Sequence, residues 1–154
     1  MPLFTKIIKD LIKKNISISV AESCSGGLIS NTLVKTDGVS KIFSYGLICY
    51  SNKSKIKYLS INKKTLNKFG AVSSNVAKEM INNLYKKEKS KITISTTGIA
   101  GPKGGSKNKP VGLVFIGIKY KNNNIIFKKR FSGNRLKIQG KTRDFVFKQI
   151  EKLI

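Results

Sequence analysis

Residues 16–27 read ISISVAESCSGG, an apolar run rich in β-branched residues that ends directly in hydroxyls and glycines. A second stretch with the same order, residues 92–105, reads ITISTTGIAGPKGG. A strand that ends in this way lets a ligand approach the backbone closely, because glycine has no Cβ and the start of a following helix offers unpaired N–H groups. Two such turns in one small chain predict one composite ligand site.

The segments around these turns alternate between helical and strand patterns. Helical spacing of apolar residues predicts helices over residues 3–14, 26–35, 53–59, 63–69, 73–87 and 138–154, with a brief helical turn at 39–43. Strands are predicted over residues 16–20, 45–51, 92–96, 111–120 and 125–131, the last two as a hairpin. Because residues 45–50 have almost no polar interruption, we expect that strand to be buried on both faces. The order of elements predicts an α/β fold, a three-layer α/β/α domain with a mixed β-sheet over residues 1–154.

Length and composition narrow the class of protein. A chain of 154 residues with 40% hydrophobic content can bury the core of one globular domain. No apolar run approaches the roughly 18 residues of a membrane span, and the N-terminal stretch lacks the apolar core of a signal peptide. Cys24 and Cys49 each lie beside the end of a predicted strand, which argues against a disulfide framework. We therefore expect a cytoplasmic protein in a reducing compartment, without membrane contact.

The net charge of +24 raises the question of a nucleic-acid partner. The basic residues are 28 Lys and only 3 Arg, and they are spread over nearly every polar face. Surfaces that bind phosphate backbones usually combine Arg with interleaved aromatic residues. The richness in Lys, Ile and Asn is typical of AT-biased coding. Composition thus favours biased coding over a nucleic-acid surface, although the charge would still attract a small anionic substrate.

The chain contains no histidine, which excludes several kinds of site. A Ser-His-Asp triad, a Cys-His pair and a histidine-ligated metal all require that residue. Only seven acidic residues are present, and most lie among lysines at helical spacing, so a carboxylate metal site or a two-carboxylate glycosidase is disfavoured. We expect no metal and no cofactor. The base of an enzyme with this composition would be a lysine, a tyrosine or Glu22.

The first turn offers a serine nucleophile. Ser23 lies where a strand meets a helix, and the N–H groups of Ser25, Gly26 and Gly27 at the helix start could hold an oxyanion. Without histidine, a lysine whose pKa is lowered by burial can serve as the base. Residues 50–55, YSNKSK, follow a predicted buried strand and supply Tyr50 at the strand end and Lys55 one helical turn later, where it could point back to Tyr50.

Each of these residues also has an ordinary structural interpretation. Ser23 and Ser25 can be simple helix caps, and Tyr50 can be a core residue with its hydroxyl at the surface. Lys55 is one of 28 lysines. Gly101, Gly104 and Gly105 can form a flexible loop, since a glycine cluster alone is a weak phosphate signal. The residues by themselves leave both interpretations open.

Five separated blocks, in their order and spacing, resemble the C-terminal domain family of CinA. They are residues 21–27, 50–55, 70–73, 97–105 and 109–112, and the resemblance runs from about residue 3 to the terminal helix. The family includes stand-alone nicotinamide-nucleotide amidases. The resemblance implies an amidohydrolase that converts nicotinamide mononucleotide to nicotinate mononucleotide and ammonia, with Ser23 as nucleophile, Lys55 as general base and Tyr50 as a helper that orients or relays the proton.

For such a reaction we expect substrate contacts around these catalytic positions, and the chain also departs from the family pattern. The expected substrate-binding residues are Ser25, Gly26, Gly27, Asn52, Thr97, Gly98, Gly101, Gly104, Gly105 and Arg135. Ser25 replaces the usual threonine, Asn134 the usual aspartate before Arg135, and Gln139 an expected arginine, which weakens the expected phosphate contacts. The longer family version carries an N-terminal pyrophosphatase-like domain whose activity we do not expect here.

Two other function classes compete with the amidase. One is a nucleotide-binding protein without catalysis, and the other is a competence-linked protein associated with nucleic acid, which the charge and the family's name suggest. We expect an anionic nucleotide as the small-molecule partner, a homo-oligomer as the assembly, and neither nucleic acid nor membrane as a partner.

Overall fold

A computed structural model describes residues 2–154 of the chain, and its centre is a five-stranded sheet. The strands lie in the order β2-β1-β3-β4-β5, and their bounds are β1 (Ile18–Glu22), β2 (Phe43–Ile48), β3 (Ile92–Gly98), β4 (Leu113–Tyr120) and β5 (Asn123–Arg130). β1 pairs in parallel with β2 and β3, whereas β4 pairs antiparallel with β3 and β5. The predicted mixed sheet is confirmed.

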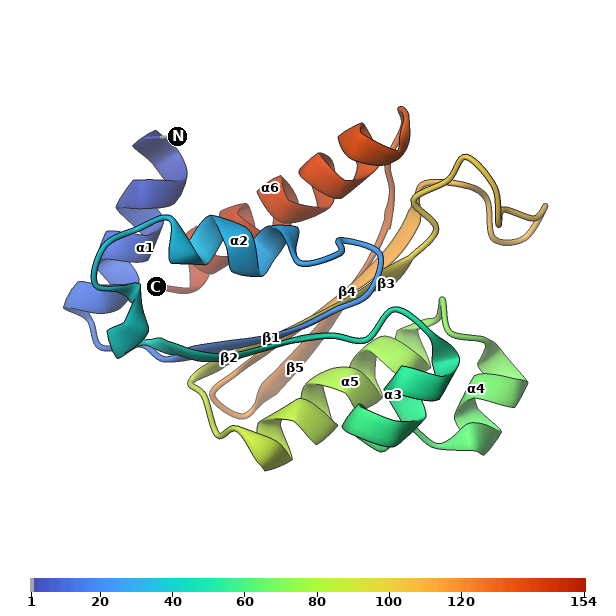
Figure 1. The fold of residues 1–154 in the computed structure, drawn as a ribbon, viewed down its shortest axis with the longest axis horizontal. Coiled ribbons are helices and arrows are strands. Elements are labelled where there is room, and N and C mark those ends of the chain that lie inside the picture. The colour runs from blue at the N-terminus through green and yellow to red at the C-terminus, as the bar shows by residue number, and fades with distance from the viewer. Residues whose placement is uncertain (1) are drawn as a thin grey trace.

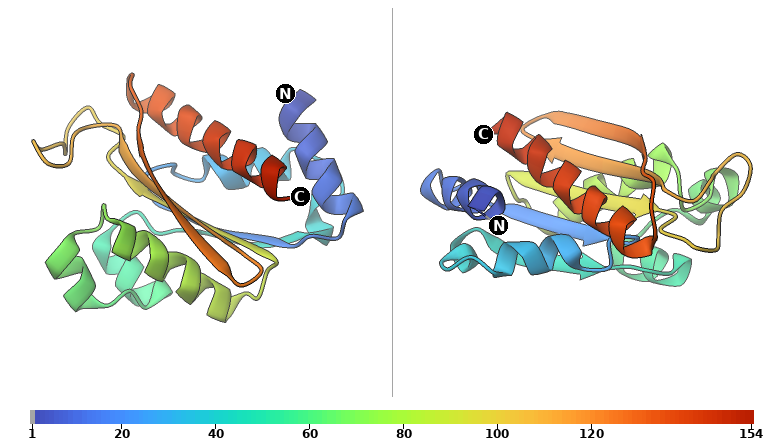
Figure 2. Two further views of the ribbon diagram at one scale, coloured as in Figure 1. Left: turned by 180° about the vertical axis from the view of Figure 1, so that it is seen from behind. Right: turned by 90° about the horizontal axis from the view of Figure 1, so that it is seen from above.

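Helices cover both faces of this sheet, as Figure 1 and Figure 2 show. One face carries α1 (Pro2–Lys13), α2 (Leu28–Val34) and α6 (Arg135–Leu153). The other carries α3 (Asn52–Leu59), α4 (Lys63–Phe69) and α5 (Ser74–Lys87). A short 3-10 helix, η1 (Val39–Lys41), joins α2 to β2. The three-layer α/β/α arrangement is therefore the observed one.

Apolar side chains fill the space on each side of the sheet. One buried cluster joins the sheet to the layer of α1, α2 and α6, and includes the Phe4 and Phe147 rings, whose centroids are 5.0 Å apart. A second joins it to the layer of α3, α4 and α5, and includes Leu59 and Met80. None of the helices between residues 2 and 154 combines the length and apolar character needed to cross a membrane.

The prediction that the second strand is buried on both faces was wrong. β2 alternates between half-buried and exposed residues, and Ile48 is 54% exposed. The reason is its place at the edge of the sheet, where it has a neighbour on one side only. β1 and β3, which lie inside the sheet with a helical layer on each face, show the continuous burial that the prediction assigned to β2.

Several element bounds also differ from the predicted ones. α2 begins at Leu28 because Gly26 and Gly27 both adopt a positive φ and stay outside the helix. α6 begins at Arg135, since the Asn134 side chain accepts a hydrogen bond from the N–H of Lys137 and caps it.

The parallel strands bring the predicted site segments to one edge of the sheet. β1, β2 and β3 run in the same direction, so the residues that follow their carboxyl ends meet there. Backbone hydrogen bonds hold this edge together: the N–H of Ser23 donates to Thr96 O at 3.0 Å, and the N–H of Cys49 donates to Glu22 O at 2.8 Å.

Candidate functional site

Ser23 and Lys55 form a buried contact pair. Ser23 directly follows β1 and is 7% exposed, while Lys55 lies in the first turn of α3 and is 1% exposed. The Lys55 Nζ donates to the Ser23 Oγ at 2.9 Å and to the carbonyl of Cys49 at 3.0 Å. The N-cap of α3 fixes the lysine, because Ser51 accepts from the N–H of Ser54 and starts the helix there. Tertiary structure thus joins two residues that are 32 positions apart in the sequence.

The surroundings of Lys55 favour its neutral form. Burial lowers the pKa of Lys55 from its usual 10.5, and the nearby thiols of Cys49 and Cys24 raise it only in part. No carboxylate between residues 2 and 154 forms an ion pair with it; the one ion pair described joins Arg143 to Asp144. A buried ammonium without a counter-ion is costly, whereas a neutral amine can donate to Cys49 O and present its lone pair to the serine hydroxyl. The pair has the geometry of a nucleophile and its base.

Glu22 organises the turn and does not act as a base. It is fully buried, and its Oε2 accepts from the Ser25 hydroxyl at 2.7 Å and from the N–H groups of Gly27 and Ile29 at 3.0 and 3.1 Å. Its Oε1 accepts from the N–H and the hydroxyl of Ser30 at 2.8 and 2.7 Å. These five contacts occupy the carboxylate completely. The carboxylate of Glu22 is therefore not available as the base that the composition allowed.

The sequence interpretation missed this capping role of Glu22. Gly27 stands at the N-cap position of α2 and has no side chain to accept the free N–H groups of the first turn. The carboxylate of Glu22 takes that place from the end of β1. The signal was present in the sequence as a glutamate just before a turn that ends in two glycines.

The predicted oxyanion donors are only partly available. The N–H of Gly26 donates to Ser23 O at 3.0 Å, and that of Gly27 donates to Glu22. Within residues 2–154, the N–H of Ser25 has no backbone acceptor, whereas that of Cys24 faces the Cys24 thiol. The expectation is therefore corrected: the N–H of Ser25 remains available beside Ser23, while the N–H groups of Gly26 and Gly27 are used within the turn.

Two further side chains support the turn. The Ser25 hydroxyl is 2.7 Å from that of Thr96, which also accepts from the N–H of Ser23 at 3.4 Å. Gln139 on α6 donates to the carbonyl of Cys24 at 3.0 Å, so the residue that replaces the expected arginine contacts the turn itself.

Cys24, next to the serine, has the environment of an inert thiol. It is 5% exposed and forms no disulfide. Burial raises the pKa of Cys24 to about 12. Since the thiolate is the reactive form, this thiol is not a nucleophile at neutral pH.

Tyr50, which follows Cys49 at the surface, contacts Arg135 instead of Lys55. Tyr50 is 54% exposed, and its hydroxyl accepts a hydrogen bond from the Arg135 guanidinium. The same guanidinium donates to Gly101 O at 2.6 Å. Arg135 thereby joins the end of β2, the start of α6 and the glycine loop. The structure brings Lys55 to Ser23, and Tyr50 to Arg135, so the expected contact between Lys55 and Tyr50 is not formed.

The remaining predicted binding residues differ in how far they are exposed to solvent. Asn52 is exposed at the first position of α3. Thr97 is 1% exposed and its hydroxyl donates to Ala71 O at 2.8 Å. A Cβ at Gly98 would lie 2.7 Å from Leu113 O, and one at Gly101 or Gly105 would meet Val111 within 2.9 Å. Gly104 is exposed. Packing against residues 111–114 therefore explains three of these glycines without a ligand.

Metal-ligating side chains do not cluster here. Residues 2–154 contain no group of three or more His, Cys, Asp and Glu side chains placed to hold a metal ion. The donors around Ser23 are hydroxyls, backbone groups and one amine.

The chain is similar to a well-populated family. The family described as the CinA C-terminal domain matches residues 2–154. The CinA-like protein of Fusobacterium nucleatum is 51% identical over 130 residues, which are 84% of this chain and 31% of that protein. The chain spans about a third of the length of the curated relatives it matches, at 32%, 36% and 31% of three of them.

Solved structures share the whole fold. The competence/damage inducible protein CihA from Agrobacterium tumefaciens has a TM-score of 0.94 and 34% identity, and the match covers 99% of this chain and 93% of that one. A competence-damaged protein (CinA) superfamily protein from Escherichia coli has a TM-score of 0.92 and 27% identity, with 99% and 88% covered.

Proposed function

This chain belongs to the CinA C-terminal domain family, and on that premise we propose that it is a serine amidohydrolase acting on nicotinamide mononucleotide. The reaction would hydrolyse the carboxamide to give nicotinate mononucleotide and ammonia. The substrate rests on the family resemblance. The reaction type rests on the site.

One observation carries the reaction type: the amine of a buried lysine lies 2.9 Å from the hydroxyl of a serine at the end of a strand. A serine hydroxyl is a weak nucleophile until an adjacent base accepts its proton. Lys55 is at hydrogen-bond distance, and burial lowers its pKa. A structural lysine would be expected to reach solvent or a carboxylate, and Lys55 does neither.

Acylation would proceed by proton transfer from Ser23 to Lys55. As the Ser23 Oγ attacks the amide carbon, the neutral amine accepts the hydroxyl proton. Negative charge develops on the amide oxygen, and the N–H of Ser25, which has no backbone acceptor, would donate to it. Lys55 then returns the proton to the departing nitrogen, which leaves as ammonia, and nicotinate remains as an ester of Ser23.

Deacylation would reverse the roles with water. A water molecule entering where ammonia left gives its proton to the neutral Lys55 as its oxygen attacks the ester carbon. The ester bond breaks, Ser23 recovers its proton from Lys55, and nicotinate mononucleotide is released. The carbonyl of Cys49 holds the amine in place through both steps.

Arg135, the neighbouring glycine loop and Asn52 are groups that could bind the nucleotide phosphate. Arg135 presents a guanidinium beside the loop of Gly101, Gly104 and Gly105, and Asn52 is exposed nearby at the start of α3. Guanidinium and backbone N–H groups are suited to phosphate. Thr97 and Gly98 would lie against the ribose or the nicotinamide ring.

The test measures ammonia release from nicotinamide mononucleotide by the purified protein and by Ser23→Ala. We expect Ser23→Ala to lose at least about 1000-fold of kcat, as removal of a nucleophile does. Ser74→Ala, an exposed serine at the start of α5, is the matched control and should keep full activity.

Two results would contradict the proposal. Normal turnover by Ser23→Ala would remove Ser23 as nucleophile. Saturable binding of the nucleotide by the natural chain without any ammonia release would favour the competing interpretation, a nucleotide-binding protein without catalysis.

A further inference from the structure

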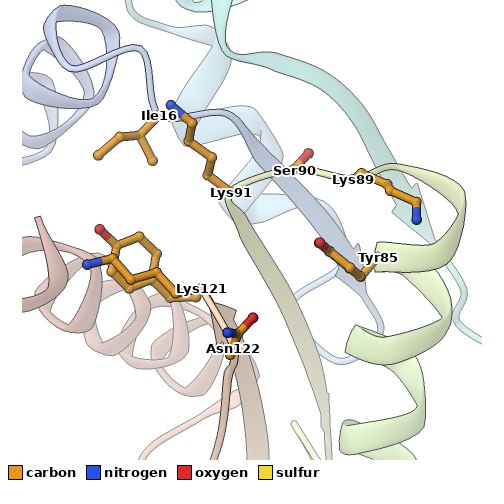
Figure 3. A pocket seen from close by; sticks show the side chains of 8 residues that line it. Ile16, Tyr85, Lys89, Ser90, Lys91, Lys121 and Asn122 are labelled. Atoms are coloured by element: carbon orange, nitrogen blue, oxygen red, sulfur yellow. The ribbon is translucent and has the colours of Figure 1, made fainter.

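A cavity lies at the end of the sheet opposite Ser23. Its volume is about 460 Å³, and Figure 3 shows the side chains that line it. They come from the last turn of α5, from the loop between α5 and β3, from the segment before β1 and from the turn between β4 and β5. Because β1 and β3 point their carboxyl ends toward Ser23, this cavity is at their amino ends. It is separate from the candidate active site, and its size falls within the roughly 300–1,000 Å³ of small-molecule sites.

The lining of this cavity is cationic. Lys89, Lys91 and Lys121 contribute three ammonium groups, and no Asp or Glu is among the eight lining residues. The neighbouring Glu88 is engaged elsewhere, since its Oε1 accepts from the Ser44 hydroxyl on β2 at 2.7 Å. The Lys91 Nζ donates to Asn15 O at 2.9 Å and is thereby held in position. The positive charge of the cavity is not neutralised from within the lining.

Two tyrosine rings flank the same cavity. The Nζ of Lys89 is 5.9 Å from the centroid of the Tyr85 ring, and that of Lys121 is 5.2 Å from the centroid of the Tyr120 ring. Each ring therefore has a cation beside it. A flat aromatic ligand could pack against such a ring while its anionic group reaches the cations.

Ser90 adds a hydroxyl to the lining. The residue is 4% exposed, and its N–H donates to Glu88 O at 2.7 Å. Its hydroxyl is not among the buried side-chain polar atoms without a partner in residues 2–154, where Thr36 Oγ1 is the atom of that kind, so the Ser90 hydroxyl stays reachable from the cavity. A hydroxyl in the wall of a cationic cavity can donate a hydrogen bond to an oxygen of an anionic ligand.

We propose that this cavity binds a phosphate monoester that carries an aromatic ring, of the size of a nucleoside monophosphate. A phosphate monoester carries about −1.5 to −2 charges at neutral pH and has three acceptor oxygens. The three ammonium groups and the Ser90 hydroxyl match that charge and those acceptors. The two tyrosine rings favour an ester with a planar ring over inorganic phosphate. The site makes no use of Ser23 or Lys55 and does not depend on the proposed amidase activity.

The experiment follows backbone amide signals of the full chain by nitrogen-15 NMR during titration with AMP, adenosine or inorganic phosphate. AMP has no carboxamide, so its binding is independent of turnover. Residue-resolved signals also distinguish binding in this cavity from binding at the candidate site near Ser23. We expect saturable AMP-induced shifts at residues 89–91 and 120–122, with weaker effects of adenosine and of phosphate.

Variants sharpen the assignment. Lys89→Gln/Lys121→Gln should raise the Kd for AMP about tenfold, and Ser90→Ala should raise it severalfold, because each removes a group that the phosphate would contact. Lys64→Gln/Lys68→Gln on α4 makes the same change in net charge at exposed positions and should leave the Kd within about twofold.

Three outcomes would overturn the proposal. The first is AMP-induced shifts confined to residues 23–27 and 101–105. The second is equal affinity for AMP and inorganic phosphate. The third is an equal loss of affinity in the α4 control, which would mean that only the overall charge of the protein attracts AMP.

Discussion

Lys55 is a residue whose chemistry comes from where it is buried. Its Nζ has two neighbours at hydrogen-bond distance, Ser23 Oγ and Cys49 O, and no carboxylate partner. An ammonium in that place would lack both a counter-ion and a third acceptor. Desolvation thus favours the neutral amine of Lys55. The chain has no histidine that could serve as a base near neutral pH instead.

The pH dependence of the rate follows from this. Because the proposed base is the neutral amine, and burial lowers the pKa of Lys55 below 10.5, kcat/KM should fall about tenfold per pH unit below that lowered pKa. The measurement is kcat/KM for nicotinamide mononucleotide between pH 5 and 10. Lys55→Met should abolish the activity at every pH, while Lys53→Met, which removes an exposed lysine from the same helix, should leave the profile unchanged. A profile that is flat on the acid side would exclude Lys55 as the base.

At the scale of elements, the start of α2 depends on a residue of another element. Helix N-termini carry free N–H groups and a partial positive charge, which usually a capping side chain satisfies. Here Gly27 cannot do so, and Glu22 at the end of β1 accepts from Gly27, Ile29 and Ser30. The carboxylate couples strand, turn and helix, and so sets where Ser23 lies.

Replacing this carboxylate should cost stability and activity together. Glu22→Gln removes the charge and places an amide donor against N–H groups, so we expect the free energy of unfolding to drop by about 2–3 kcal/mol. Urea unfolding measures the drop, and the amidase assay should show a lower kcat. Glu151→Gln, at an exposed position of α6, is the control and should change stability by less than about 0.5 kcal/mol. Equal stability of the Glu22→Gln variant and the natural chain would show that the hydrogen bonds to Glu22 contribute little.

At the scale of the whole molecule, the site joins segments that belong to opposite faces of the sheet. The turn that holds Ser23 leads into α2 on one face, and Lys55 belongs to α3 on the other, so the contact between Ser23 and Lys55 forms only when both layers pack on the sheet. Burial of an unpaired lysine is therefore part of the folding energy. The free energy of unfolding should therefore change when Lys55 is protonated.

The lowered pKa of Lys55 makes the free energy of unfolding depend on pH. Between the lowered pKa of Lys55 in the folded protein and the usual 10.5, the unfolded chain binds the additional proton, so stability rises with pH. Lys55→Met lacks this effect. The stability of the natural chain relative to Lys55→Met should therefore rise with pH in that window, by up to about 1.4 kcal/mol per pH unit, and level off below it.

Urea unfolding of both proteins from pH 6 to 10 measures this difference. Lys53→Met, compared with the natural chain in the same way, should show a difference that does not change with pH. A constant difference for Lys55→Met would mean that Lys55 keeps an ordinary pKa in the folded state.

Much of the architecture follows from the sequence alone, because the hydrophobic period of each segment reflects which side it buries. The alternation of helical and strand patterns predicted the layered fold with a mixed sheet, and the turns after β1 and β3 predicted that Ser23 and the glycine loop face a common edge. Where a strand lies in the sheet is a different matter. The apolar run of β2 suggested an interior strand, but the order β2-β1-β3-β4-β5 places it at the edge.

Only the tertiary structure decided which side chains meet. Tyr50 and Lys55 are neighbours in sequence, yet Lys55 turns inward to Ser23 and Tyr50 outward to Arg135. Glu22 could be a base by composition, and five donors from the following turn and helix make it an anchor instead. The physical reason is the same in both cases: a local pattern fixes the conformation of the backbone, whereas the partner and the solvation of a polar side chain depend on segments that are distant in the sequence.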